Sequence, residues 1–169
     1  MSDPQPAAEL VITRVFDAPR DRVWAAWTKP EQLTRWWGPQ GMEIQITGFD
    51  LRPGQRCVYV MRGQGGVELW GRFVYREIAA PGRLVWANAF ADASGEAVHA
   101  EMAPGFPLEV QNEVTLEETE GRTTLTLRST PLAATEEETA VFTGMLESMQ
   151  QGFGGTFDKL RAWLAAPAA

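Results

Sequence analysis

The stretch TEEETAVFTGMLESMQQGFGGTFDKLRAWL, residues 135–164, decides the fold, because it is the only long run in the chain with sustained helical periodicity. Its apolar residues recur at steps of three and four, which predicts one apolar stripe along a helix. The stripe consists of Val141, Phe142, Met145, Leu146, Met149, Phe153, Phe157, Leu160, Trp163 and Leu164. An unbroken helix over this range would be roughly 45 Å long, at about 1.5 Å per residue. A stripe of that length needs a large apolar surface, so we expect the helix to lie on a sheet.

Glycines interrupt this helical pattern, at Gly144, Gly152, Gly154 and Gly155. Each costs on the order of 1 kcal/mol against alanine in a helix interior. Either a strand or a short helix approaches the backbone closely near residues 152–155, or the helix bends there. Under the first explanation, Gly154→Leu is expected to destabilise the fold. Both explanations divide the helix into an upper half, residues 141–149, over a cavity and a lower half, residues 157–164, in the core.

Most of the chain before residue 135 is predicted to form short antiparallel strands. We expect them at residues 10–16, 43–51, 55–62, 67–78, 83–91, 108–118 and 122–130. Turn signals such as Pro81-Gly82 and Glu120-Gly121 separate them at hairpin spacing. In the predicted strand over 108–118 the even positions from Leu108 to Leu116 are apolar except Asn112, so they are expected to face inward. Residues 97–107 are expected to form a loop at one end of the sheet.

Two short helices are predicted between the first and second strands. Asp21 is expected to cap the first, whose buried face would hold Val23, Trp24 and Trp27. Pro30 suits the first turn of the second helix, which is expected over residues 31–37.

The adjacent tryptophans Trp36 and Trp37 fall at the end of this second helix. Successive residues on a helix diverge by about 100°, so the two rings are not expected to face the same core. One of them is expected to cap a cavity mouth or to contact a partner chain.

These elements predict an α+β fold in which a curved antiparallel sheet of six to seven strands wraps around a long C-terminal helix, with two short helices after the first strand. Such a sheet and helix are stable when the helix lies across the apolar face. A chain of 169 residues suits one domain, expected over residues 9–166, and residues 1–8, with two prolines, are expected to form a flexible tail. A sheet that curves around a helix splays away from it at one end, and that space is the candidate site.

The charge and cysteine content exclude several classes of function. The formal net charge is −7, and the 15 Lys and Arg residues form no cluster, which argues against a nucleic acid or an anionic membrane as partner. One cysteine cannot support an internal disulfide or a cysteine-rich zinc site. The N-terminus lacks a signal sequence and no window approaches the ~20 apolar residues of a membrane span, so no membrane insertion and a cytoplasmic location are expected.

Six segments occur in a characteristic order: RVFDAPR (14–20), VWAAWT (23–28), WWGP (36–39), DLRPG (50–54), PGRLV (81–85) and SMQQGFGGTFDKL (148–160). Together they resemble the helix-grip (START-like, SRPBCC) superfamily, which holds START domains, birch-pollen-allergen-like proteins and polyketide cyclases. The nearest branch is the one named for its similarity to the activator of the 90-kilodalton heat-shock chaperone ATPase. The resemblance spans about residues 10–165 and implies the helix-grip fold, without a shared catalytic motif. Gln55 and Cys57 stand where this branch tends to have glycine and an aromatic residue.

Catalytic motifs are absent from the sequence: there is no Gly-x-Ser-x-Gly, no His-Glu-x-x-His, no phosphate-binding glycine loop and no dinucleotide fingerprint. The only histidine, His99, is expected on a surface loop, and the only cysteine, Cys57, as a buried and unreactive thiol in a strand. No catalytic residue, metal ligand or cofactor is predicted.

Two amides interrupt apolar strand faces, since Asn88 lies in phase with Trp86 and Phe90, and Asn112 with Val110 and Val114. A buried amide without a partner costs on the order of 1 to 3 kcal/mol, so each is expected to have a protein, water or ligand partner. A mostly apolar pocket with a few polar groups is typical of small-molecule sites. The alternative is that each amide bonds a neighbouring backbone group at a bulge.

The leading hypothesis is a domain that binds an apolar or aromatic small molecule, such as a lipid or polyketide, between sheet and helix. Its wall is predicted from Trp37, Tyr59, Met61, Phe73, Trp86, Asn88, Phe90, Asn112, Met145, Met149 and Phe153. A second hypothesis is an enzyme of the polyketide cyclase or hydrolase kind, with Asn88, Asn112 or His99 polarising a carbonyl. A chaperone-binding module ranks last, because no basic patch is present to meet an acidic client. A homodimer and the identity of the ligand stay open.

Overall fold

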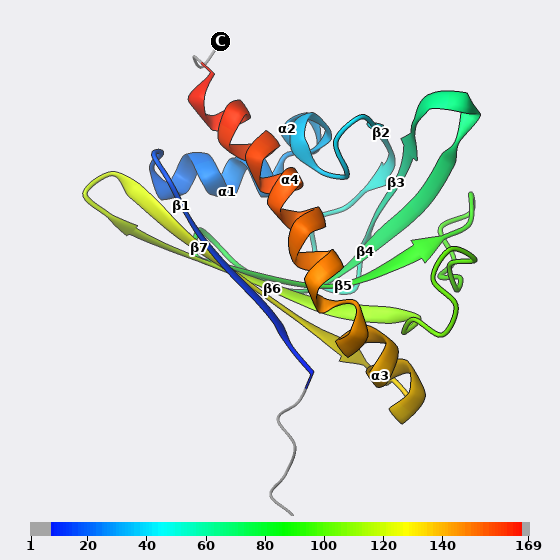
Figure 1. Cartoon of the computed structure of the whole chain (residues 1–169). Helices are drawn as coiled ribbons and strands as arrows, with labels where there is room; N and C mark the ends of the chain where they lie inside the picture. The colour runs from blue at the N-terminus through cyan, green and yellow to red at the C-terminus, as the bar shows by residue number, and fades with distance from the viewer. Residues whose placement is uncertain (1–7, 167–169) are drawn as a thin grey trace, which may run out of the picture.

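The computed structural model describes residues 8–166, and in it a seven-stranded antiparallel sheet curves around a C-terminal helix (Figure 1). The strands are β1 (Leu10–Phe16), β2 (Glu43–Phe49), β3 (Arg56–Arg62), β4 (Glu68–Ala79), β5 (Arg83–Ala91), β6 (Glu109–Thr119) and β7 (Arg122–Leu132). Their order across the sheet is β1-β7-β6-β5-β4-β3-β2, so β1 and β2 form the two edges. The predicted α+β helix-grip architecture is confirmed. Of the tail predicted over residues 1–8, only Ala8 lies within the described residues, and it packs against the core.

Two helices follow β1, as predicted: α1 (Arg20–Thr28) and α2 (Pro30–Trp36). Pro30 occupies the start of α2, where its missing N–H leaves no hydrogen bond unmade. The prediction that Asp21 caps α1 is wrong. The helix starts at Arg20 after Pro19, which makes no side-chain capping bond, and Asp21 lies inside the first turn. Its carboxylate there faces the positive end of the helix dipole.

Both adjacent tryptophans are buried, so the prediction that they cannot share a core is wrong. Helix α2 ends at Trp36, and Trp37 has an extended backbone with φ −69° and ψ 145°. The ~100° divergence of neighbouring helical residues therefore does not apply to this pair. The indole nitrogen of Trp36 donates to the carbonyl of Ala26 at 2.9 Å, and the Trp37 ring lies 5.1 Å from that of Phe73.

The predicted C-terminal helix is two helices, α3 (Glu136–Gly144) and α4 (Leu146–Ala165). Thr135 and Glu138 form a reciprocal capping box that fixes the start of α3. The break is at Met145, with φ −104° and ψ 4°. The bend expected near residues 152–155 is thus wrong, because α4 runs unbroken through them.

The proposed close backbone approach to these glycines is also wrong. A Cβ added to Gly152 would meet nothing within 4 Å, and one added to Gly154 would come no closer than 3.4 Å to the guanidinium of Arg14. At Gly155 the nearest atoms belong to the side chain of Gln40, at 3.6 Å. These neighbours are the ends of long side chains, which can move aside. The structure therefore predicts no collision with backbone atoms in the Gly154→Leu variant.

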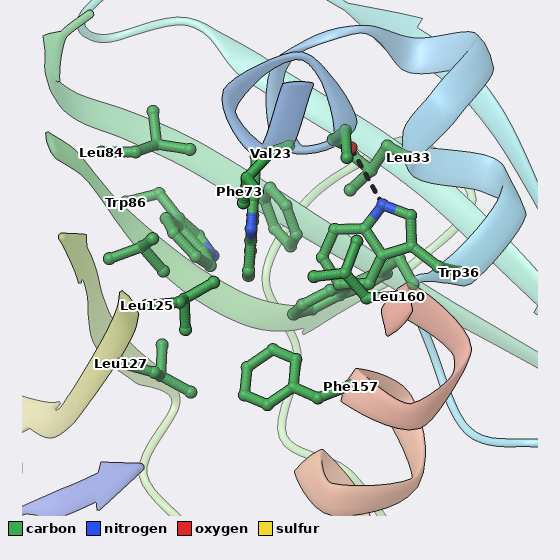
Figure 2. Close-up of a cluster of buried hydrophobic side chains, with 14 of the residues drawn as sticks. Val23, Leu33, Trp36, Phe73, Leu84, Trp86, Leu125, Leu127, Phe157 and Leu160 are labelled. Carbon is green, nitrogen blue, oxygen red and sulfur yellow. Dashed lines mark hydrogen bonds between the residues drawn. The ribbon is translucent and has the colours of Figure 1, made fainter. Parts of the chain in front are cut away.

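The core lies between the concave face of the sheet and α1, α2 and the C-terminal part of α4 (Figure 2). Phe157 and Leu160 of α4 are fully buried in it, as the predicted lower half of the helix requires. Trp27 of α1 is surrounded by aromatic rings, with centroids at 4.6 Å for Trp36 and 5.3 Å for Trp86. This aromatic cluster fills one end of the space under α4, and the cavities lie beyond it.

Candidate ligand-binding site

Cavity 1 has a volume of about 450 Å³ and lies between the sheet, the loop that joins β5 to β6, and the α3–α4 junction. Its lining is Asn88, Ala89, Phe90, Met102, Ala103, Phe106, Pro107, Leu108, Val110, Asn112, Ser129, Met145, Met149 and Phe153. The size and the apolar lining are typical of small-molecule pockets.

Cavity 2 has a volume of about 330 Å³ and lies against the turn that leaves α2. Its lining is Trp37, Gly38, Pro39, Tyr59, Met61, Asn88, Ala89, Phe90, Met149, Gly152, Phe153 and Thr156. Both cavities are lined by Asn88, Ala89, Phe90, Met149 and Phe153. These shared residues, here called the partition, make the two cavities adjoining chambers of one site.

Most of the predicted wall residues line a chamber. Trp37, Tyr59 and Met61 line cavity 2, Asn112 and Met145 line cavity 1, and Asn88, Phe90, Met149 and Phe153 belong to the partition. Phe73 and Trp86 line neither chamber. Their rings are fully buried and lie 5.1 Å apart in the core behind the wall.

Several lining residues were not predicted. Met102, Ala103, Phe106 and Pro107 belong to the β5–β6 loop, where no periodicity shows which way a side chain faces. Leu108 was predicted to face inward but was not named as a wall residue. Ser129 did carry a signal, since it is a polar residue in phase with the inward-facing Leu125 and Leu127 of β7.

Three neighbouring strands bring polar side chains together on the wall of cavity 1. Ser129 lies opposite Asn112 in the β6–β7 register, and its hydroxyl donates to the Asn112 side-chain oxygen. The Asn112 amide nitrogen donates to Asn88 Oδ1 at 3.4 Å, and the Trp86 indole donates to the same oxygen at 3.4 Å. Asn112 lies in a regular part of the β6–β7 ladder, and its hydrogen bonds are to side chains. Asn88 bonds a backbone group, the Arg72 carbonyl at 3.5 Å. The alternative of a bulge therefore does not hold for Asn112.

Tyr59 is one of the polar residues that line cavity 2, with Asn88 and Thr156. It pairs with Gly71 across β3 and β4, and a Cβ on Gly71 would lie only 2.5 Å from the Tyr59 hydroxyl. The ring thus lies directly on the β4 backbone, which glycine alone permits. Burial raises the pKa of Tyr59 to about 12, and polar contacts with Trp37 and Asn88 partly oppose this rise. The hydroxyl is protonated at neutral pH and is a hydrogen-bond donor.

The wall of cavity 2 is fixed to α4 by hydrogen bonds to the turn after α2. Thr156 Oγ1 and Lys159 Nζ both donate to the Gly38 carbonyl, at 3.1 Å and 3.2 Å. Burial lowers the pKa of Lys159. Gln40 in turn donates to the Gly155 carbonyl at 3.3 Å. This turn and α4 therefore position Trp37 against the partition together.

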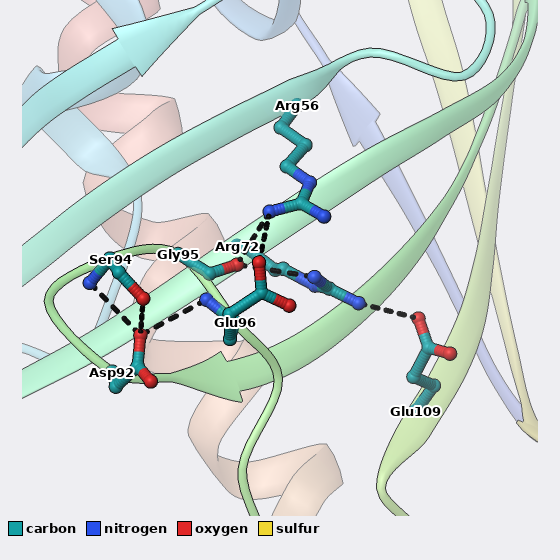
Figure 3. Close-up of polar contacts among 7 residues, drawn as sticks. All are labelled: Arg56, Arg72, Asp92, Ser94, Gly95, Glu96 and Glu109. Carbon is teal, nitrogen blue, oxygen red and sulfur yellow. Dashed lines mark hydrogen bonds and ion pairs between the residues drawn. The ribbon is translucent and has the colours of Figure 1, made fainter.

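Cavity 1 is covered by residues 97–108, here called the cover loop, and arginines of the sheet's convex face hold the segment at its base (Figure 3). Arg56 and Arg72 each donate to the Gly95 carbonyl at 3.1 Å. Arg72 also lies 3.6 Å from the carboxylate of Glu109, just beyond the other end of the loop. One arginine thus contacts the chain on both sides of the cover loop.

Charged side chains are missing from both linings, which contain no Asp, Glu, Lys, Arg or His. His99 is exposed and lines neither chamber. Within residues 8–166, no three His, Cys, Asp or Glu side chains lie close enough together to hold a metal ion. None of the helices in the described part of the chain is long and apolar enough to cross a membrane.

The fold and these cavities define a helix-grip domain of the general ligand-binding type. The family model described as "Activator of Hsp90 ATPase homolog 1-like protein" matches residues 17–165, and the chain belongs to this family. Among curated proteins, none matches the chain.

Solved structures support this assignment. The chain is 31% identical to a protein from Arthrobacter aurescens, with a TM-score of 0.81 and coverage of 96% of this chain and 88% of that one. It is 27% identical to protein Ms6760 from Mycobacterium smegmatis, with a TM-score of 0.77 and coverage of 96% and 94%. The AHSA1 protein from Silicibacter pomeroyi shares the fold at 19% identity, with a TM-score of 0.71 and coverage of 94% and 98%.

Proposed function

We propose that this domain binds a small, neutral, apolar or aromatic molecule of the lipid or polyketide kind in cavities 1 and 2. The observation that carries the proposal is the pair of adjoining chambers with an apolar lining that contains no charged side chain. Moving an unpaired charge out of water costs far more than moving an apolar group, so such a lining selects neutral ligands. The single free cysteine, Cys57, favours a reducing compartment such as the cytoplasm.

The two other hypotheses have less support. For the cyclase or hydrolase alternative, His99 is not available as a catalytic group, because it is exposed and lines neither cavity. That alternative rests on Asn88 and Asn112 alone. A chaperone-binding role, which the family description suggests, ranks last because the 15 Lys and Arg residues form no sequence cluster that would meet an acidic client. A homodimer is compatible with either role.

Binding of N-phenyl-1-naphthylamine, a neutral probe that fluoresces in apolar surroundings, tests the proposal. The protein is expected to bind it saturably, with an affinity in the micromolar range. Met149→Trp, which fills the partition, is expected to lower the affinity at least about tenfold, because overpacking removes the space for the probe. Glu147→Trp is the matched control, since this exposed residue of α4 lines neither chamber. Absence of saturable binding, or equal losses in the two variants, would reject the proposal.

A further inference from the structure

We infer that the ligand carries an uncharged carbonyl, and that the Tyr59 hydroxyl donates a hydrogen bond to its oxygen in cavity 2. This inference rests on the proposed function and names the chemical class of the ligand. It follows from the direction of the hydrogen bonds around Asn88.

The Trp86 indole fixes these directions, because an indole N–H can only donate. It lies 3.4 Å from Asn88 Oδ1, so that atom is the amide oxygen. The Asn112 atom at 3.4 Å from the same oxygen must then be its amide nitrogen, and the Ser129 hydroxyl donates to the remaining oxygen of Asn112. Asn88 therefore has its acceptor occupied by two donors and keeps its NH2 group for other partners.

Only one proton of that NH2 group has a partner in the protein backbone, the Arg72 carbonyl at 3.5 Å. Asn88 lines both chambers, whereas Tyr59 lines cavity 2. Asn88 and Trp37 also contact the Tyr59 hydroxyl. Both groups can only donate here, the indole by its chemistry and Asn88 because its oxygen is occupied, so neither accepts the proton of Tyr59. Tyr59 lines cavity 2, where its hydroxyl can donate this proton to a ligand.

The site thus presents the hydroxyl of the buried Tyr59 as a donor, and a buried donor without an acceptor is costly. A carboxylate or phosphate would supply acceptors, but neither lining offers a positive charge to compensate for its desolvation. A neutral carbonyl oxygen accepts this hydrogen bond with no charge to bury. A ketone or quinone on an apolar skeleton therefore satisfies both the Tyr59 donor and the lining.

The hydroxyl is also held in place. Gly71 lies directly under it, and the rings of Tyr59 and Phe73 pack edge to face at 5.5 Å. A donor that is already oriented loses little freedom when the ligand binds.

The test uses 2-acetylnaphthalene and 2-ethylnaphthalene, which have similar size and differ in the carbonyl. Tyr59→Phe is expected to lower the affinity for 2-acetylnaphthalene about three- to tenfold, which is the contribution of one neutral hydrogen bond. The affinity for 2-ethylnaphthalene is expected to stay unchanged. Tyr75→Phe is the matched control, because this buried hydroxyl of β4 lines neither chamber. It is expected to leave the affinities of both probes unchanged.

Infrared spectroscopy of the wild-type complex gives a second measurement that needs no variant. The carbonyl stretch of the bound ketone is expected at lower wavenumber than in hexane, and Tyr59→Phe is expected to reverse part of that shift. If both probes bind and the stretch is not shifted, or if Tyr59→Phe weakens both equally, the inference is overturned while the proposed function stands. If neither probe binds to the folded protein, the proposed function fails as well.

Discussion

Cys57 and Tyr59 lie on the same inward face of β3, and both are harder to ionise in the folded than in the unfolded chain. Burial raises the pKa of Cys57 to about 12 from an ordinary value of 9.0. Burial likewise raises the pKa of Tyr59 to about 12 from 10.0. A group whose pKa rises on folding holds more protons in the folded state, so the stability it supports is fully present below the unfolded pKa and is lost as the pH rises toward the folded one.

We therefore expect the free energy of unfolding to fall as the pH rises from 9 to 12, with a slope of up to about 1.4 kcal/mol per pH unit for each group. Urea denaturation between pH 7 and pH 11 measures this dependence. Cys57→Ala, with no thiol to ionise, is expected to be less stable at pH 7 and to show a shallower fall between pH 9 and pH 10. A wild-type stability that stays constant to pH 11 would contradict the assignment.

Residues of the site were predictable where a regular strand fixes their direction. Asn112 is two residues from Val110 and from Val114, so all three face the same side of the strand. The inward orientation of Asn112 follows from this period of two alone. Phe106 could not be found this way, because it lies in the cover loop and its position depends on contact with the Phe142 ring at 5.9 Å. Trp37 was predicted as a wall residue, yet its extended backbone, which buries it beside Trp36, was not.

Among the elements, α4 tolerates glycines for which the structure provides no packing reason. Gly152 lies in the helix interior, and an added Cβ would meet nothing within 4 Å. Gly152→Ala is therefore expected to raise the free energy of unfolding by about 0.5–1 kcal/mol, because alanine restricts the unfolded chain and favours the helix.

Urea denaturation of this variant measures the gain, with Gly105→Ala as the contrasting control. Gly105 has φ +79°, and its added Cβ would lie 3.2 Å from Val141, so that variant is expected to lose stability. A loss in Gly152→Ala would instead reveal a close contact at the helix that the structure does not contain.

The strands were predictable as elements, since turn pairs such as Pro81-Gly82 separate runs with a period of two. The observed strand ends differ from the predicted ones by at most two residues, and those of β1 and β5 coincide with them. The break between α3 and α4 was not predictable from periodicity. Met145 continues the apolar series of a single helix, and only its backbone angles interrupt the hydrogen-bond pattern.

At the scale of the whole molecule, Arg72 links the convex face of the sheet to the cover over cavity 1. Its side chain is only 11% exposed and contacts Gly95 on one side of the cover loop and Glu109 on the other. Arg56 contacts Gly95 and Glu96, both on the first side only. The two arginines therefore differ in how much of the loop they restrain.

Arg72→Met is expected to speed amide hydrogen exchange in residues 97–108 at least about threefold, because loss of these contacts favours local opening. The same variant is expected to release N-phenyl-1-naphthylamine faster. Mass spectrometry of exchanged peptides and stopped-flow fluorescence measure the two effects. Arg56→Met is the control, with a smaller change in both, and equal behaviour of the two variants would show that Glu109 contributes nothing to closure.

Three side chains of the partition, Phe90, Met149 and Phe153, would determine the length of the site. Met149 is unbranched, with several rotatable bonds, and Phe90 and Phe153 turn about only two. A change of rotamer at this wall would join the chambers without any movement of the backbone. The same fold would then accept a short ligand in one chamber or a long ligand that extends through both. The range of ligand lengths would depend on three side chains.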